Sequence, residues 1–396
     1  MIVGVAVETY PQERRVALVP AHVPKLVELG LEVLVQKGAG ERAGFPDASY
    51  QEQGARLVPD RTELFASADV LLQVHPLDAN PALAQENLDL MRRDQIVLGL
   101  LNPLGAPEAA QELAERGITA FALELLPRIS RAQPMDALTS MATVAGYKAV
   151  LVAAGALHKM FPLMMTAAGT LSPARVLVIG AGVAGLQAIA TAHRLGAVVQ
   201  AYDVRPAVKE QVESLGVKFL ELELKSADAE ETGGYARTMD EDFYRRQREL
   251  MTRVIAECDI VITTAAVPGK KAPMLIPEAA VQGMRPGSVI LDLAAESGGN
   301  CELTQPGETV ECHGVTILGP VDLPSTVPYH ASQMYSRNVT AFLQNLVKDG
   351  QLKLNLEDEI IGETLLTHQG EIVNSQVREL LARPASASVS DGRSNS

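Results

Sequence analysis

The glycine-rich segment that starts at residue 180 has the spacing of a dinucleotide-binding turn. Gly180, Gly182 and Gly185 form the pattern GxGxxG between an apolar run, Arg175–Ile179, and a helical stretch, Leu186–Leu195. The first glycine permits a tight turn, the second lets the backbone approach a pyrophosphate, and the third lets the helix pack closely on its strand. Amides at the helix N-terminus then bind the anion. We therefore predict a dinucleotide site; the alternative is a glycine-tolerant turn that binds no ligand.

A carboxylate follows the next apolar run, where such a site binds ribose. The run Val198–Tyr202 ends in Asp203, about 20 residues beyond the glycines, where a carboxylate accepts hydrogen bonds from ribose hydroxyls. An aspartate there repels the 2′-phosphate of NADP, so the pattern favours NAD(H). Arg205 lies either against the adenine or on the surface as a solvated cation, and the sequence leaves both alternatives open.

A polar segment, Pro127–Asp136, stands directly before a long apolar helical stretch. Loops at such boundaries often carry side chains that contact ligands. Arg128, Gln133 and Asp136 offer donors and acceptors that suit a carboxamide. The alternative is an ordinary loop in which Asp136 caps the following helix.

Paired glycines beside an aromatic residue mark a second loop, Gly233–Ala236, after an acidic stretch. Tyr235 in this loop either covers a bound ligand as part of a mobile flap or belongs to a plain surface turn. Its spacing does not decide between the two.

The histidines and cysteines form no recognisable catalytic or metal-binding motif. Seven histidines are scattered without HExxH or closely spaced pairs, and the chain contains no GxSxG. We therefore expect no metal site and no serine-hydrolase elbow. Three cysteines are too few for a disulfide framework, which favours a reducing compartment.

The net charge and the hydropathy argue against a nucleic-acid partner and against a membrane span. Acidic residues outnumber basic ones by 48 to 34, and the net charge of −14 repels nucleic acid. No basic region precedes the first apolar run, which predicts a cytoplasmic protein whose chain starts with a strand. The apolar segment 149–171 contains His158 and Pro162, so we expect a buried helix followed by a loop and not a membrane span.

Short apolar runs alternate with helical stretches in two separate regions of the chain, which predicts two mostly parallel sheets. The fold class is therefore α/β, with two Rossmann-like domains joined by long helices. The first sheet is expected to contain strands at Ile2–Val7, Glu32–Val35, Asp69–Val74, Gln95–Leu101 and Thr119–Leu123. The second is expected to contain Arg175–Ile179, Val198–Tyr202, Val217–Leu220, Asp259–Thr263, Ser288–Leu293 and Val315–Leu318.

The chain crosses between the two predicted domains twice. A helical segment, Asp136–His158, makes the first crossing, and a proline-rich stretch, Leu323–Tyr329, leads into a helix at about 331–349. We therefore expect residues 1–137 and 327–382 to form one discontinuous domain and residues 138–326 to form the NAD(H)-binding domain. The tail 383–396 is rich in Ser and Ala and is expected to be flexible.

Taken together, these motifs resemble the alanine dehydrogenase/pyridine nucleotide transhydrogenase family. The resemblance runs through most of the chain, and within the family it is greatest for the NAD(H)-binding components of proton-translocating transhydrogenases. The segments that carry it are Glu13–Pro20, Arg128–Asp136, Gly146–Ala149, Gly180–Pro206, Gly233–Ala236, Asp292–Thr304 and Gly319–Asn338.

The resemblance implies roles for individual residues. The loop before the long helix would hold the nicotinamide, and the flap with Tyr235 would close over the cofactor. Thr139 stands where the family usually has a serine, and it keeps the hydroxyl. The implied catalytic residues are Arg128, Gln133, Asp136 and Thr139. The implied cofactor-binding residues are Ile129, Ser130, Gly180, Gly182, Val183, Gly185, Asp203, Val204, Arg205, Gly234, Tyr235 and Ala266.

The two branches of the family differ in the chemistry that they require. Alanine dehydrogenase needs acid and base groups near its amino acid. Where that branch has its lysine, histidine and aspartate, this chain has the segment around His75, Asn102 and Glu296, so that Arg15 alone remains. Direct hydride transfer between two nicotinamides needs no such groups.

The resemblance therefore implies an NAD(P) transhydrogenase component that transfers hydride between NADH and NADP(H) bound on a partner. Membrane-spanning subunits would conduct the protons. The chain would form a homodimer and associate peripherally with the inner membrane from the cytoplasm. The alternatives are an alanine or other amino-acid dehydrogenase and, from another class, a non-catalytic NAD-sensing module.

Overall fold

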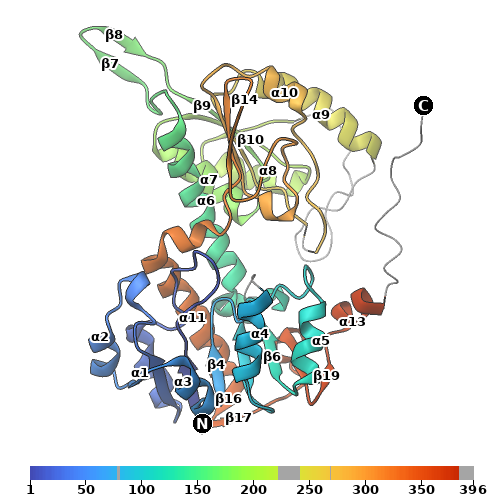
Figure 1. Ribbon diagram of the computed structural model, residues 1–396. Helices are drawn as coiled ribbons and strands as arrows, with labels where there is room; N and C mark the ends of the chain where they lie inside the picture. The colour runs from blue at the N-terminus through green and yellow to red at the C-terminus, as the bar shows by residue number, and fades with distance from the viewer. Residues whose placement is uncertain (78–80, 222–240, 268, 383–396) are drawn as a thin grey trace. The chain divides into compact units, whose positions relative to one another are not determined.

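A computed structural model describes residues 1–77, 81–221, 241–267 and 269–382, and these form two compact units (Figure 1). The first unit comprises Met1–Leu138 and the chain from Pro328 onward, and the second comprises Thr139–Val327. The domain limits expected from the sequence, 137/138 and 326/327, each lie one residue from these boundaries. The tail expected to be flexible, 383–396, lies outside the described residues.

The first unit contains an eight-stranded sheet in the order β19-β18-β6-β5-β4-β1-β2-β3. Strands β1 to β6 pair in parallel, whereas β18 pairs antiparallel with both β6 and β19. All five strands predicted from apolar runs are present, and the sequence analysis missed the edge strands β3 and β19 and the antiparallel strand β18 between β19 and β6. The strands are β1 (Ile2–Val5), β2 (Glu32–Gln36), β3 (Arg56–Val58), β4 (Val70–Leu72), β5 (Ile96–Gly99), β6 (Thr119–Ala122), β18 (Leu365–His368) and β19 (Glu371–Ile372).

The second unit contains a seven-stranded sheet in the order β11-β10-β9-β12-β13-β15-β14. Every predicted strand forms and pairs in parallel, and the unpredicted β14 is the antiparallel edge. β12 and β13 are buried along their whole length, as expected for strands covered on both faces. The strands are β9 (Arg175–Ile179), β10 (Val198–Tyr202), β11 (Lys218–Phe219), β12 (Ile260–Thr263), β13 (Val289–Asp292), β14 (Thr309–Cys312) and β15 (Val315–Leu318).

Both sheets carry helices on their connections, and the predicted α/β class with two Rossmann-like units is confirmed. The helices of the first unit are α1 (Val23–Glu28), α2 (Asp47–Glu52), α3 (Arg61–Ser67), α4 (Pro81–Leu90), α5 (Glu108–Glu115), α11 (Pro328–Leu346), α12 (Glu359–Thr364) and α13 (Ser375–Ala382). Those of the second are α7 (Val183–Arg194), α8 (Lys209–Ser214), α9 (Glu241–Ile255) and α10 (Glu278–Gln282). Two small hairpins are β7 (Met164–Thr166) with β8 (Gly169–Leu171) and β16 (Val347–Lys348) with β17 (Gln351–Leu352).

Helix α6 (Ala137–Ala156) continues from the first unit into the second. It is the one described helix that is long and apolar enough to cross a membrane by length and composition. Its second half places Ala149, Val150 and Ala153 in the core of the second unit, as core helices do. The loop expected after this helix is instead a short hairpin, β7–β8.

Helix α6 packs closely against the first turn of α7. A Cβ built on buried Gly146 would lie 2.1 Å from the carbonyl oxygen of Ala184, so no side chain fits between the two backbones. Gly155 of the same helix is exposed, and no described atom lies within 4 Å of its Cβ position. Only one of these two helical glycines is therefore required by packing.

We predict opposite effects for alanine at these two positions. Gly146→Ala should lower the free energy of unfolding by about 1–3 kcal/mol because two helices must move apart. Gly155→Ala should leave it unchanged or raise it by up to about 1 kcal/mol because alanine favours the helix. Chemical denaturation followed by circular dichroism measures both, and equal stabilities for the two variants would contradict the close packing of α6.

Candidate functional site

The predicted dinucleotide site lies at the point where the strand order of the second sheet reverses. β9 and β12 are neighbours, but the strand after β9 lies on one side and the strand after β12 on the other. Their connections therefore diverge and leave a crevice at the carboxyl ends, the usual ligand position in open α/β sheets. Gly180 follows β9, and Thr264 follows β12.

Two of the three glycines are required by the fold itself. Gly180 has a φ of +98°, and a Cβ there would lie 2.4 Å from Thr264 Oγ1. A Cβ on Gly185 would lie 1.9 Å from the carbonyl oxygen of Gly180, which brings α7 onto its strand. At Gly182, in contrast, the Cβ position has no described atom within 4 Å. Gly182 thus leaves open space for a ligand.

Helix α7 directs its first amides into this space. It begins at Val183, three residues earlier than expected, because Gly182 in extended conformation serves as its N-cap. No side chain among the described residues caps it, and its first turn holds no acidic residue. The first amides of a helix have no partner within the helix and favour an anion. The residues present therefore fit a pyrophosphate.

Asp203, the residue predicted to bind ribose, also organises the glycine turn. It is buried directly after β10, and its Oδ2 accepts a hydrogen bond from Ala181 N at 2.7 Å. Its Oδ1 accepts from Arg205 N at 2.8 Å. The Arg205 guanidinium completes the arrangement, with Nε 3.0 Å from Oδ1 and one terminal nitrogen 2.9 Å from Oδ2. The turn and the carboxylate are therefore one unit.

The burial of Arg205 excludes one of the two positions that the sequence left open for this side chain. Its exposure is only 9%, so it is not a solvated surface cation. It occupies acceptor positions of Asp203 and compensates its charge, so a ribose hydroxyl must share or replace one of these contacts. The electrostatic case against NADP consequently rests on the Asp203–Arg205 pair and not on a bare carboxylate. Val204, between them, is partly buried against the core.

A clamp that the sequence did not reveal fixes the loop after β12. The side chain of Asn300 accepts a hydrogen bond from Ala265 N at 3.1 Å and donates one to Ala265 O at 2.8 Å. The fully buried Asp292 holds the backbone amide of Asn300 at 2.7 Å and the hydroxyl of Thr263 at 2.9 Å. These contacts position the loop that carries Ala266, a predicted cofactor-binding residue.

The predicted nicotinamide loop lies in the first unit and is more regular than expected. Residues Ser130–Met135 form a 3-10 helix. Arg128 and Gln133 are exposed, whereas Ile129 and Asp136, at the two ends of this turn, are partly buried. Helix α6 begins directly after Asp136, and Thr139 lies in its first turn.

Two distant residues hold this loop in place. Arg131 forms a two-point ion pair with Asp358, at 2.7 and 2.8 Å, and this pair lowers the pKa of the Asp358 carboxyl. Asn338 of α11 donates a hydrogen bond to Pro134 O at 2.8 Å. The loop backbone is thus fixed at both points. The predicted flap residues Gly234 and Tyr235 lie outside the described residues.

The strand order of the first sheet reverses between β1 and β4, and that edge carries acidic side chains in place of glycines. Glu8 accepts hydrogen bonds from Val74 N and His75 N at 2.6 and 3.1 Å. Burial raises the pKa of Glu8 to about 7, with a further contribution from nearby Glu13. Burial also raises the pKa of Glu124 to about 7.

Arg15, the residue shared with the alanine dehydrogenase branch, is paired within the first unit. Its Nε and one terminal nitrogen lie 2.8 and 2.5 Å from the two carboxylate oxygens of Glu13, and both side chains are buried. The same terminal nitrogen lies 3.1 Å from His75 Nε2. Asn102 has a left-handed backbone conformation, and its backbone N–H donates a hydrogen bond to Glu124 Oε1 at 2.6 Å. These contacts give Arg15 a carboxylate partner from the chain itself.

The fold and the glycine-lined crevice define a dinucleotide-binding α/β protein. Family models named "Alanine dehydrogenase/PNT" match nearly the whole chain, the N-terminal domain at residues 4–145 and the C-terminal domain at residues 149–375. The chain belongs to the alanine dehydrogenase/pyridine nucleotide transhydrogenase family.

Relatives from both branches of the family are similar over nearly the full chain. An NAD(P) transhydrogenase alpha-subunit protein of Rhodospirillum rubrum is 47% identical over 94% of this chain and 98% of that protein. The alanine dehydrogenase of Mycobacterium tuberculosis is 29% identical over 97% and 98%. The crystal structure of a transhydrogenase from Sinorhizobium meliloti matches with a TM-score of 0.84 and 43% identity, covering 94% of this chain and all of that one.

We predict that Gly182→Ala separates binding from folding. The backbone angles at this residue suit alanine and the space is open, so the unfolding midpoint should stay unchanged. NADH affinity should fall at least about tenfold, or about 1.4 kcal/mol, because the added methyl group occupies the pyrophosphate position. Fluorescence titration with NADH measures the affinity.

Gly185→Ala is the matched comparison. Its Cβ would lie 1.9 Å from the carbonyl oxygen of Gly180, so this substitution should destabilise the second unit itself. If Gly182→Ala bound NADH as tightly as the parent chain, the pyrophosphate would have to lie elsewhere.

Proposed function

We propose that this chain is the NAD(H)-binding component of a proton-translocating NAD(P) transhydrogenase. The observation that carries the proposal is the glycine-lined crevice of the second unit in a chain 47% identical to a transhydrogenase subunit over nearly its whole length. When bound, NADH supplies the hydride. The chain's own residues bind and orient the dinucleotide, and they need move no proton in the transfer.

The second unit would hold the adenosine and pyrophosphate moieties of NAD(H). Gly182 and the first amides of α7, beginning at Val183, would bind the pyrophosphate. Asp203 would accept from the ribose, with Arg205 and Val204 beside it. Gly180 and Gly185 would shape the turn, and Ala266 would close the crevice on the β12 side.

The loop of the first unit would hold the nicotinamide. Arg128, Gln133 and Asp136 would fix the carboxamide, with support from Ile129, Ser130 and Thr139. The segment with Gly234 and Tyr235 would cover the cofactor. Rings held at the correct distance react without a separate acid or base, so this loop needs polar groups that orient and not groups that titrate.

The paired state of Arg15 supports this function over amino-acid oxidation. An alanine dehydrogenase must bind the carboxylate of its substrate and move a proton from its amine. Here Glu13 pairs with one edge of the Arg15 guanidinium and competes with a substrate carboxylate for that side chain. Asn102 cannot exchange a proton at neutral pH.

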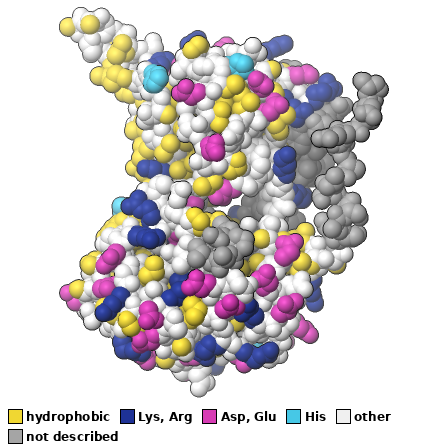
Figure 2. Space-filling view, viewed as in Figure 1, with side chains coloured by type: hydrophobic (Ala, Val, Ile, Leu, Met, Phe, Trp, Pro, Cys, Tyr) yellow, Lys and Arg dark blue, Asp and Glu magenta, His cyan; other side chains and the backbone are white. Residues whose placement is uncertain are grey.

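The proposed assembly includes a second copy of this chain and further subunits. The β7–β8 hairpin of the second unit extends away from its sheet (Figure 1), and hydrophobic side chains gather on it (Figure 2). Leu163, Met165 and Leu171 are 55%, 78% and 49% exposed. Such a patch suits a protein partner, and we assign it to a homodimer contact.

The other partners would bind NADP(H) and cross the membrane. Differential affinity of two conformational states would couple hydride transfer to proton flow. The chain itself would lie on the cytoplasmic face of the inner membrane, held there by those subunits.

A reconstituted assay tests the function. Mixed with the NADP(H)-binding component of a transhydrogenase, the purified chain should catalyse hydride transfer between NADH and bound NADP without a membrane, because direct transfer needs only apposed rings. Proton pumping should require the membrane subunits. With L-alanine and NAD, or with pyruvate, ammonia and NADH, the chain alone should show no turnover.

The outcomes separate the alternatives. Alanine-dependent reduction of NAD by the chain alone would overturn the proposal in favour of an amino-acid dehydrogenase. Failure of the mixed assay with a preparation that still binds NADH would favour an NAD-sensing module.

We also predict that Gln133→Ala slows transfer by about 10–100-fold, because a slightly misplaced ring reacts slowly. The Kd for NADH should hardly change, since the second unit supplies most of the contacts. Stopped-flow transfer rates and NADH titration measure the two effects. Gln111→Ala, at an exposed position of α5, is the control and should change neither quantity. Equal losses of rate and affinity would make the loop a binding element.

A further inference from the structure

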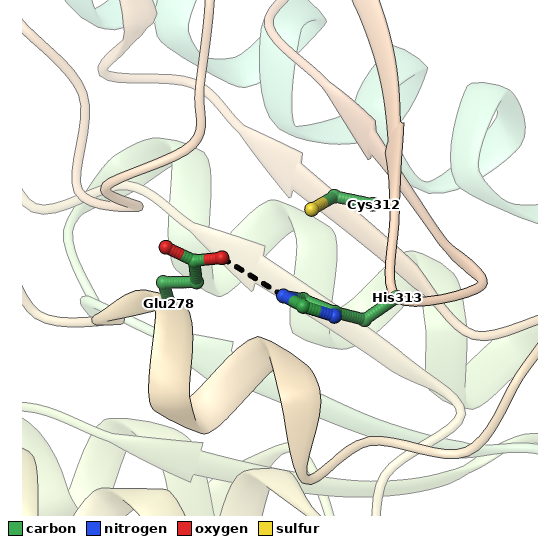
Figure 3. Close-up of side chains that lie close together, drawn as sticks. All are labelled: Glu278, Cys312 and His313. Carbon is green, nitrogen blue, oxygen red and sulfur yellow. Dashed lines mark hydrogen bonds and ion pairs between the residues drawn. The ribbon is translucent and has the colours of Figure 1, made fainter.

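Three side chains with metal-binding atoms converge in the second unit, away from the glycine turn in sequence. Glu278 is the first residue of α10, Cys312 is the last of β14, and His313 follows in the turn to β15. One ligand atom from each lies within 4.8 Å of the other two. Glu278 Oε1 and His313 Nε2 are 2.9 Å apart, and the sulfur of Cys312 points toward the same space (Figure 3).

The chemistry of this set suits a borderline-soft divalent cation. Thiolate, imidazole and carboxylate are the three ligand types that Zn²⁺ binds, at about 2.0–2.3 Å. In a tetrahedral site such ligands lie roughly 3.3–3.6 Å apart. In the structure, the Glu278 and His313 atoms lie 2.9 Å apart and no two of the three ligand atoms are more than 4.8 Å apart. Calcium and magnesium prefer oxygen ligands and do not match a sulfur.

The backbone around the three residues holds them in a fixed frame. Cys312 pairs with Val315 across the hairpin, and His313 and Gly314 both have positive φ, at +53° and +74°, as in a two-residue type I′ turn. Glu278 N donates to Glu302 Oε2 at 2.7 Å, which anchors the start of α10. The partly exposed side chains leave room for water as a fourth ligand.

We propose that Glu278, Cys312 and His313 form a binding site for a zinc-class cation that links α10 to the β14–β15 hairpin. On binding, the Cys312 thiol releases its proton to solvent and the sulfur bonds to the metal. His313 keeps its ring proton on Nδ1 and offers the lone pair of Nε2 in place of its hydrogen bond to Glu278. No sequence motif marks the site, because the fold brings together residues 35 positions apart.

Cobalt titration of the full chain tests the proposal. Co²⁺ should bind with one equivalent per chain and produce the near-ultraviolet charge-transfer band of a cobalt–thiolate bond, and Zn²⁺ should displace it. Cys312→Ser should abolish the band. Cys258 and Cys301 are buried, and burial raises their pKa values to about 12 and about 11, so neither should supply the thiolate.

Two further variants keep the test independent of folding. His313→Asn retains a residue that tolerates the left-handed turn, and Glu278→Gln retains the shape of the side chain. Each should weaken cobalt binding at least about tenfold, because a metal ligand is lost. His330→Asn, an exposed histidine of the first unit, should leave it unchanged.

Zinc should also raise the unfolding temperature of the parent chain, and less so that of Cys312→Ser, since a ligand of the folded state stabilises it. A charge-transfer band that survives Cys312→Ser, or the absence of a band at stoichiometric cobalt, would overturn the site. Parent-like affinity in His313→Asn would do the same.

Discussion

The first turn of α7 packs directly against the backbone on two sides, against α6 and against the glycine turn. Neither contact leaves room for a side chain. Gly146 of α6 meets the carbonyl of Ala184, and the next residue, Gly185, meets the carbonyl of Gly180. Because successive residues of one turn are fixed from two sides, the direction of the helix axis and of its first amides is set by packing. An anion site made of backbone amides depends on that direction. Packing therefore requires Gly180 and Gly185, whereas Gly182 is the glycine of this pattern that leaves open space among the described atoms.

Buried carboxylates fix the loops at the strand ends, as packing fixes helix α7. Asp203 joins the glycine turn to Arg205, and Asp292 holds Asn300, which in turn holds both polar backbone atoms of Ala265. A buried charge is costly unless its acceptor positions are filled. Filling them requires several backbone amides to take fixed positions, so that each aspartate makes its surrounding loop rigid. The crevice edges are thus shaped before any ligand arrives.

The sequence predicted what depends on short-range patterns. Apolar runs located every parallel strand except the edge strand β3, and the glycines and Asp203 pointed to the crevice, because these signals lie within one strand–turn–helix segment. The edge strand β14 and the antiparallel strand β18 were missed, since short strands that are only partly buried or pair with distant segments leave little periodicity. The Asn300 clamp and the Arg131–Asp358 pair were also missed, because their partners are remote in sequence and only the fold brings them together. Arg205 could not be placed until its burial was known.

The strand order reverses at one crossover point in each large sheet, between β1 and β4 in the first unit and between β9 and β12 in the second. The two points differ in what their backbone amides contact. In the second unit, the amides of α7 after β9 meet no capping side chain among the described residues. In the first, the amides of Val74 and His75 after β4 already donate to the Glu8 carboxylate. A side-chain anion there occupies the position that an external anion would need, and its raised pKa shows the cost of keeping it buried. The glycine-lined crossover point keeps its backbone donors for a phosphate. Of the two crossover points, the second is therefore the one whose described backbone donors remain available to an external anion.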